Sequence, residues 1–185
     1  TSTKTFTGNA STTNFTIQNG ATAVLPALFA MAGNYVNNGT TTAGTGTTTL
    51  NGTTTQSLSG TMTGTSAFNN LQITNTSGVG SSTQSILFLA SASTTDTFSM
   101  TASTSAQFLA GATSTFQNIK LSGASGQKVW LRSSTPGTQY GFYVPGTQRD
   151  VSYVDAQDNS ACPTIILATN GTNVNSGNNT CWSFA

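Results

Sequence analysis

Short stretches of alternating apolar and polar residues run along most of the chain. Leu71 and Ile73 form one such pair of apolar residues two positions apart, and Ile119 and Leu121 form another. An apolar residue at every second position is the pattern of a β-strand with one buried face. Thr fills many of the positions between, and its branched side chain suits a strand better than a helix. We therefore expect an all-β protein with very little helix.

The chain also contains internal repeats. Residues 68–78 match residues 116–126 at an offset of 48, with the same apolar positions and the same closing Ser-Gly. We expect a third copy at residues 151–160. Repeated strand and turn blocks favour a right-handed parallel β-helix, in which each coil stacks on the preceding one. A β-sandwich is the alternative, because short strands separated by turns about every 8 to 12 residues also describe that fold.

Equivalent residues of successive coils form ladders in a parallel β-helix, and the repeats predict two ladders that point inward. The first contains Leu71, Ile119 and Val154, and the second contains Ile73, Leu121 and Ala156.

Several blocks resemble the repeats of large secreted bacterial cell-surface proteins, which are mostly uncharacterised and come in many cases from environmental bacteria. The resemblance is carried by residues 33–40, 42–47, 50–53 and 68–78, and more loosely by residues 107–184. It implies a parallel β-helix, an extracellular or cell-surface location, and an adhesive or structural role. It brings no catalytic motif with it.

The composition excludes most kinds of active site. Thr (38), Ser (23), Gly (19) and Asn (17) make up 97 of the 185 residues, charged residues are 5%, and the chain has no His and no Glu. Catalytic triads with His, His metal sites and Glu pairs are therefore impossible. We expect no enzyme and no cofactor.

The charge and the apolar segments exclude two kinds of partner. A net charge of +1 with five scattered cations gives no patch that could neutralise phosphates, so we expect no nucleic-acid partner. The longest apolar stretch, residues 21–32, contains Pro26 and is much shorter than the roughly 20 residues of a membrane helix. We expect no membrane span.

Cys162 and Cys181 are the two cysteines of the chain. In a chain rich in Thr, Ser and Asn and without His, we favour a disulfide over a metal pair, and a disulfide indicates an oxidising compartment. We expect three regions: an N-terminal strand segment at residues 1–20 that is open to exchange with a neighbouring molecule, β-solenoid coils at residues 21–161, and a disulfide-closed segment at residues 162–185.

The four acidic residues offer weak candidate sites. Asp155, Asp158 and Asn159 are a weak Ca²⁺ candidate, because two carboxylates supply few of the six to eight oxygen ligands that Ca²⁺ takes. We favour a role for these acids in a corner of the solenoid. Asp150 and Asp155 are the other acids near Asp158 that could complete an acid pair for polysaccharide cleavage, and we do not expect catalysis there.

Two further sets of residues are candidates for modification or binding. Asn-x-Ser/Thr acceptors for N-glycosylation occur at Asn9, Asn14, Asn38, Asn51, Asn75, Asn170 and Asn178. Aromatic residues for core packing, a subunit interface or sugar stacking crowd into the last third, at Trp130, Tyr140, Tyr143, Tyr153 and Trp182.

Two functions fit these features. The first is a secreted structural subunit that self-assembles into an extracellular filament or surface layer, so that its partners are copies of itself. The physical argument for this function is that a solenoid ends in strand edges that need a partner. Neither end of the sequence shows a charged or helical cap. The alternative is an adhesin or carbohydrate-binding stalk domain of a cell-surface protein, with glycans as partners.

Overall fold

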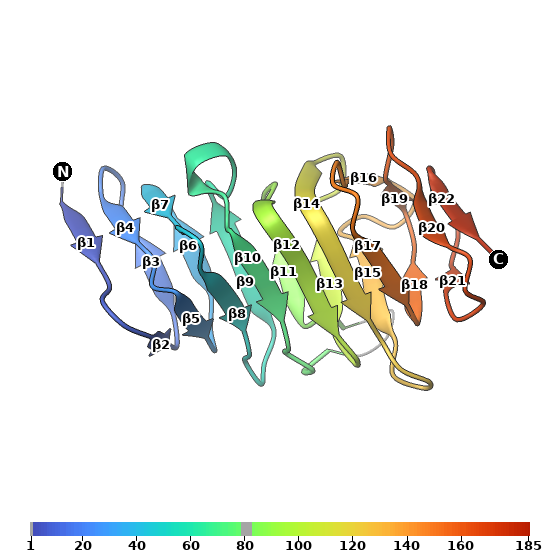
Figure 1. Ribbon diagram of the computed structural model, residues 1–185, viewed down its shortest axis with the longest axis horizontal. Helices are drawn as coiled ribbons and strands as arrows, with labels where there is room; N and C mark the ends of the chain where they lie inside the picture. Colours follow the sequence, from blue (N-terminus) through green and yellow to red (C-terminus); the bar gives the residue numbers. More distant parts are fainter. Residues whose placement is uncertain (1, 79–82) are drawn as a thin grey trace.

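The protein is an elongated stack of coils built from parallel strands, with its two chain ends at opposite ends of the long axis (Figure 1). The computed structural model describes residues 2–78 and 83–185. Each pairing between named strands is parallel and joins a strand to its counterpart in the next coil. The fold is the parallel β-helix that the sequence predicts, and the β-sandwich alternative is wrong.

The strands form three faces, which the chain visits in a fixed order in every coil. The first face begins with the sheet of β1 (Thr3–Thr5), β4 (Thr22–Val24) and β7 (Thr40–Thr42). The third face is an eight-stranded sheet of β3 (Phe15–Ile17), β6 (Tyr35–Asn37), β9 (Gln56–Gly60), β11 (Ile86–Phe88), β13 (Ser105–Phe108), β15 (Val129–Ser133), β18 (Val154–Ala156) and β21 (Val174–Asn175). One strand per coil gives about eight coils.

The second face is built on a nine-stranded sheet that also extends the first face. Its members are β2 (Ala10–Thr12), β5 (Leu28–Met31), β8 (Thr47–Leu50), β10 (Asn70–Ile73), β12 (Ser93–Thr101), β14 (Thr113–Ser122), β16 (Tyr140–Tyr143), β17 (Arg149–Ser152) and β19 (Asn159–Ser160). β14 pairs with β16 through its first residues and with β17 through its last ones, so it crosses from the first face to the second.

Two short elements complete the architecture. β20 (Ile166–Ala168) and β22 (Trp182–Phe184) pair with each other in a two-stranded sheet at the C-terminal end. A 3-10 turn, Gly64–Ser66, lies beside β7, where the Ser66 hydroxyl accepts a hydrogen bond from the Thr41 amide.

Apolar ladders run through the interior, as the alternation of the sequence predicts. One ladder on the second face joins residues that are at most 9% exposed, in the order Met31, Leu50, Ile73, Met100, Leu121 and Val151. Each member stacks on the next at the spacing of paired strands, about 4.8 Å, so that water is excluded along the whole axis.

The two predicted ladders are correct in part. Leu71 and Ile119 share one inward row, but Phe98 lies between them, so the offset of 48 residues spans two coils. Val154 is inward on the third face, where it pairs with Val129. The same holds for the second ladder, because Ala156 also lies on the third face while Val151 continues the row of Leu121. The register predicted for the third repeat is therefore wrong, because the turn from β17 to β18 is shorter than the turn from β14 to β15.

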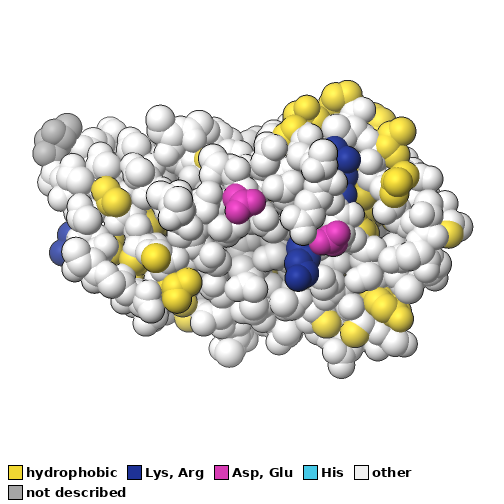
Figure 2. Space-filling view, viewed as in Figure 1, with side chains coloured by type: hydrophobic (Ala, Val, Ile, Leu, Met, Phe, Trp, Pro, Cys, Tyr) yellow, Lys and Arg dark blue, Asp and Glu magenta, His cyan; other side chains and the backbone are white. Residues whose placement is uncertain are grey.

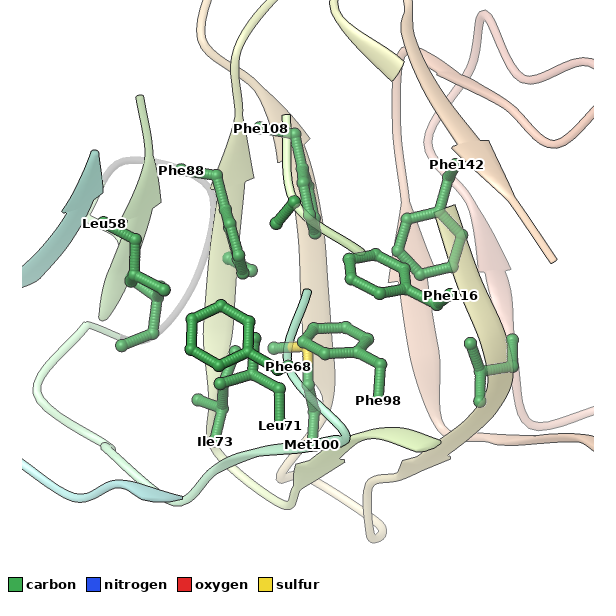
Figure 3. Close-up of a cluster of buried hydrophobic side chains, with 14 of the residues drawn as sticks. Leu58, Phe68, Leu71, Ile73, Phe88, Phe98, Met100, Phe108, Phe116 and Phe142 are labelled. Carbon is green, nitrogen blue, oxygen red and sulfur yellow. The ribbon is translucent and has the colours of Figure 1, made fainter. Parts of the chain in front are cut away.

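Aromatic rings fill the middle of the stack (Figure 3). Phe88 stacks on Phe108 from neighbouring strands of the third face, with ring centroids 4.6 Å apart. Phe98 stacks on Phe116 at 4.2 Å from the opposite side of the interior. Phe88 and Phe108 are paired in register, because parallel strands place identical positions above one another, whereas Phe98 is paired with Ile119 and Phe116 with Thr94.

Buried side-chain amides form hydrogen bonds with backbone N–H and C=O groups at the corners of the coils. The Gln56 side chain donates to the carbonyl oxygens of Met31 and Gly33 and accepts from the Gly52 amide, while Asn75 donates to Gln56 Oε1 at 2.9 Å. These neutral groups bond the polar backbone of the turns without any buried charge.

Residues 2–20 form the first coil of this stack. β1, β2 and β3 pair with β4, β5 and β6, respectively. The N-terminal segment, which we expected to be open to exchange with a neighbouring molecule, thus pairs on one side with strands of its own chain. Its other side faces the N-terminal end of the stack.

Candidate functional site

The acidic candidates for Ca²⁺ are engaged by hydrogen-bond donors of the protein. Asp158 is 3% exposed and accepts from the Gly137 amide and from Asn178 Nδ2, and Asn159 Oδ1 accepts from the Trp182 indole at 2.7 Å. Within the described residues no group of three or more His, Cys, Asp or Glu could hold a metal ion. The geometry therefore gives these residues a structural role at the corner between the third and first faces.

Asp155 forms a buried ion pair that the sequence analysis missed. Its Oδ1 lies 2.9 Å from Arg132 Nη2, and the Ser176 hydroxyl donates to the same oxygen at 2.6 Å. Arg132 Nη1 also donates to the Asp155 carbonyl at 2.7 Å. The two residues are 23 positions apart in the sequence. Their contact could be predicted only if the length of the coil between them were known.

The acidic candidates for polysaccharide cleavage lie on different faces of the coil. Asp150 lies on the second face in β17, where it accepts from Gln148 Nε2, whereas Asp155 lies on the third face. Asp158 lies at the corner that follows the third face, where it accepts from the Gly137 amide and from Asn178 Nδ2.

The aromatic candidates are spread over different parts of the molecule. Tyr140 is fully buried and stacks on Phe108 at 4.8 Å, and burial raises the pKa of its hydroxyl well above the usual range. Tyr140 is therefore a core residue and is not available for sugar stacking. Trp130, Tyr143 and Tyr153 are half-buried and lie on the third face, on β16 and at the corner before β18.

The candidate glycosylation sites divide by exposure. Asn75 is 1% exposed, and its Nδ2 donates to the Thr54 carbonyl, so the folded protein does not offer it for modification. Asn170 and Asn178 are exposed but donate through Nδ2 to Val151 and Gly137. The remaining four sites are exposed on the surface: Asn9, Asn14, Asn38 and Asn51.

The C-terminal end carries the disulfide. Cys162 and Cys181 are bonded, with their Cα atoms 5.2 Å apart. The bond joins the segment that leads into β20 to the segment that leads into β22. The rings of Trp182 and Phe184 stack at 5.5 Å and pack against the last residues of the core, where both remain partly exposed. A disulfide is typical of proteins from oxidising compartments.

The N-terminal end has a similar partly exposed aromatic pair. The rings of Phe6 and Phe15 lie 5.8 Å apart, and Phe15 contacts Phe29 at 4.9 Å. Beside them lies an open hollow of about 360 Å³ that Ile17 also lines. Lys4 Nζ sits 5.9 Å from the centre of the Phe6 ring. An apolar hollow of this kind at a row of strand edges is a candidate docking surface.

Strand edges without a neighbour occur at both ends. Among the described residues, β1, β2 and β3 pair on one side each, and so do β21 and β22 at the other end. Between the ends, the surface carries few charges, as Figure 2 shows for one side of the molecule, and hydrophobic side chains gather toward the C-terminal end of that side. The two ends together form the candidate site.

Comparisons with protein-family models, with curated proteins and with solved structures found no match. In the described part of the chain, no helix is long and apolar enough to cross a bilayer.

Proposed function

We propose that this chain is a secreted structural subunit that assembles end to end into an extracellular filament or surface layer. The observation that carries the proposal is the pair of open ends. Each end presents unpaired edges of parallel strands beside a partly exposed aromatic pair.

Strand direction makes the two ends complementary. Because all strands of the stack are parallel, the edge of β22 in one copy and the edge of β2 in the next can continue the same ladder. A contact between two different surfaces of the same chain is a head-to-tail contact, and it generates an open polymer when its rotation does not close a ring.

The low charge also supports the proposal. Lys4 is the charged residue that lines the N-terminal hollow, so electrostatic repulsion between the N-terminal end of one copy and the C-terminal end of the next is small. An interface held mainly by apolar area and backbone hydrogen bonds depends weakly on ionic strength. The disulfide supports a secreted location, because such bonds persist in oxidising compartments.

A proline at the outer edge of β2 tests the proposal. In β2 the Thr12 carbonyl accepts from the Ala32 amide, so the alternation of a parallel strand turns the Ser11 amide toward the open end. Ser11→Pro removes that donor without removing a bond to β5. We expect the unmodified 185-residue chain to form polymers visible by electron microscopy, and Ser11→Pro to lower the polymer fraction at least tenfold.

Ser11→Ala is the matched control, because it keeps the amide, and it is expected to assemble like the parent chain. Far-ultraviolet circular dichroism confirms that both variants keep the β-fold. If the parent chain remains a monomer by light scattering at high concentration under both oxidising and reducing conditions, self-assembly is wrong, and the stalk or adhesin function becomes the proposal to test.

A further inference from the structure

The ladder of the second face is interrupted before the last coil. Among the described residues, β17 pairs with β14 and β20 pairs with β22, and no backbone ladder joins β17 to β20. The Val151 carbonyl in β17 accepts instead from the side-chain amides of Asn170 and Asn173, at 2.9 and 3.4 Å. A surface groove of about 270 Å³, lined by residues of β17 and by Ile165 and Leu167, marks the interruption.

The last strand therefore depends on a small set of attachments. β22 is paired with β20, the Trp182 indole donates to Asn159, and the disulfide binds Cys181 directly before the strand. The segment directly before Cys181 has further hydrogen bonds to the preceding coil that do not depend on the disulfide. The Ala161 amide donates to the Thr180 carbonyl, and Asn179 Nδ2 donates to the Ala156 carbonyl. Loss of the disulfide thus acts mainly on β22 and the aromatic pair that it carries.

The disulfide is open to exchange at one of its two residues. Cys162 is exposed at the corner before β20, while Cys181 is half-buried. A thiolate of a dithiol reductant attacks Cys162 Sγ and releases Cys181 as a thiolate, which takes up a proton. The second thiol of the reductant then displaces Cys162, so the reductant leaves as a cyclic disulfide and the protein keeps two thiols.

We propose that the Cys162–Cys181 disulfide is the switch for assembly at the C-terminal end. This inference rests on the proposed function, because it assigns the regulation of the same surface. With the bond closed, β22 supplies the strand edge and the Trp182–Phe184 pair that the next copy contacts. With the bond reduced, β22 separates from β20 and the end loses the edge of β22 together with its aromatic pair, while the ladders from β3 to β18 remain intact. The subunit is then unable to assemble until it reaches an oxidising compartment.

Hydrogen exchange and electron microscopy of the same samples test the switch. The 185-residue chain is prepared oxidised and after reduction with dithiothreitol, and exchange is followed by mass spectrometry in peptides that cover β22 and β13. We expect reduction to speed the exchange of β22 amides at least tenfold, to leave β13 unchanged, and to lower the polymer fraction at least tenfold.

Variants separate the thiol chemistry from other effects of the reductant. The double variant Cys162→Ser/Cys181→Ser is expected to match the reduced protein and to be indifferent to dithiothreitol. Deletion of residues 182–185 is expected to abolish assembly and leave the exchange of β13 unchanged. If this deletion increases assembly, β22 is a cap that blocks the end, and the switch as proposed is wrong.

The outcomes for the switch and for the proposed function are distinct. If polymers form equally with the disulfide closed and reduced, or if β22 exchanges equally in both states, the switch is overturned while self-assembly stands. If neither state forms polymers, self-assembly is overturned. If, in addition, β22 exchanges at the same rate in both states, the claim that the disulfide holds β22 in place is also overturned.

Discussion

At the scale of single residues, the buried charged side chains among the described residues are Asp158 and the ion pair between Arg132 and Asp155. Both members of the pair are at most 9% exposed, and the pair carries additional hydrogen bonds to Ser176 and to the Asp155 carbonyl. Buried charges are tolerated when such bonds replace the lost hydration. The pair links β15 to β18, next to the buried apolar pairs Val129–Val154 and Leu131–Ala156.

The ion pair predicts a large asymmetry between single and double substitutions. Arg132→Met leaves the Asp155 carboxylate buried without a cation and is expected to lower the free energy of unfolding by about 3–5 kcal/mol. Arg132→Met/Asp155→Leu removes both charges and is expected to recover most of that loss. Urea denaturation measures both, with exposed Lys120→Met as a control within about 0.5 kcal/mol of the parent chain. Equal losses in the single and double variants would contradict this account.

At the scale of elements, inward positions on the strands hold the coils in register. Ile119 in β14 is fully buried between Phe98 of the coil before and the backbone of Arg149 in the coil after. A parallel strand shifted by one residue would place its whole apolar row outside, so the register is fixed by burial. β14 joins two faces, and a defect there disrupts both.

Ile119→Asp is therefore expected to unfold the central coils. It places a charge without a partner in a dry interior and is expected to lower the free energy of unfolding by more than about 4 kcal/mol. Gln117→Asp, at an exposed position of the same strand, is the matched control and is expected to lie within about 0.5 kcal/mol of the parent chain. Thermal unfolding followed by circular dichroism checks both. A folded Ile119→Asp variant with an unchanged melting temperature would contradict the inward ladder.

At the scale of the whole molecule, the scarcity of titratable groups sets the response to pH. The chain has no His, which is the side chain whose ordinary pKa lies between about pH 5 and 8. Two tyrosines respond at high pH. Burial raises the pKa of Tyr35 to about 12, partly offset by hydrogen bonds to Thr41 and Asn37, and raises that of Tyr140 further.

These shifts predict a loss of stability at alkaline pH. Because the folded pKa of Tyr35 lies above its unfolded value of 10.0, its contribution is fully present below pH 10 and is lost as the pH rises toward about 12. The difference between the unfolded pKa of 10.0 and the folded pKa of about 12 corresponds to about 2–3 kcal/mol. Urea denaturation of Tyr35→Phe is expected to show a shallower decline of the free energy of unfolding above pH 10 than the parent chain. Parallel declines in the two proteins would contradict this assignment.

The sequence by itself determined the strand pattern, the stacking of coils and the disulfide, because each depends on local periodicity or on a single possible cysteine pair. Leu71, Ile73, Ile119 and Leu121 point inward as their alternation requires. The sequence also determined that sites built on His or Glu are impossible in this chain, because the absence of a residue type can be read without a structure.

The tertiary structure alone decided which residues meet across coils. The position of Val154 on the third face, the pairing of Arg132 with Asp155 and the burial of Asn75 all depend on turn lengths, which vary from coil to coil. Because turns of different length leave the strands in register, the spacing along the sequence does not tell which residues of two coils lie opposite each other. The tertiary structure also decided that an aromatic pair lies at each end of the molecule. In a solenoid, residues at equivalent places of neighbouring coils contact each other, while the first and last strands lie at opposite ends of the long axis (Figure 1).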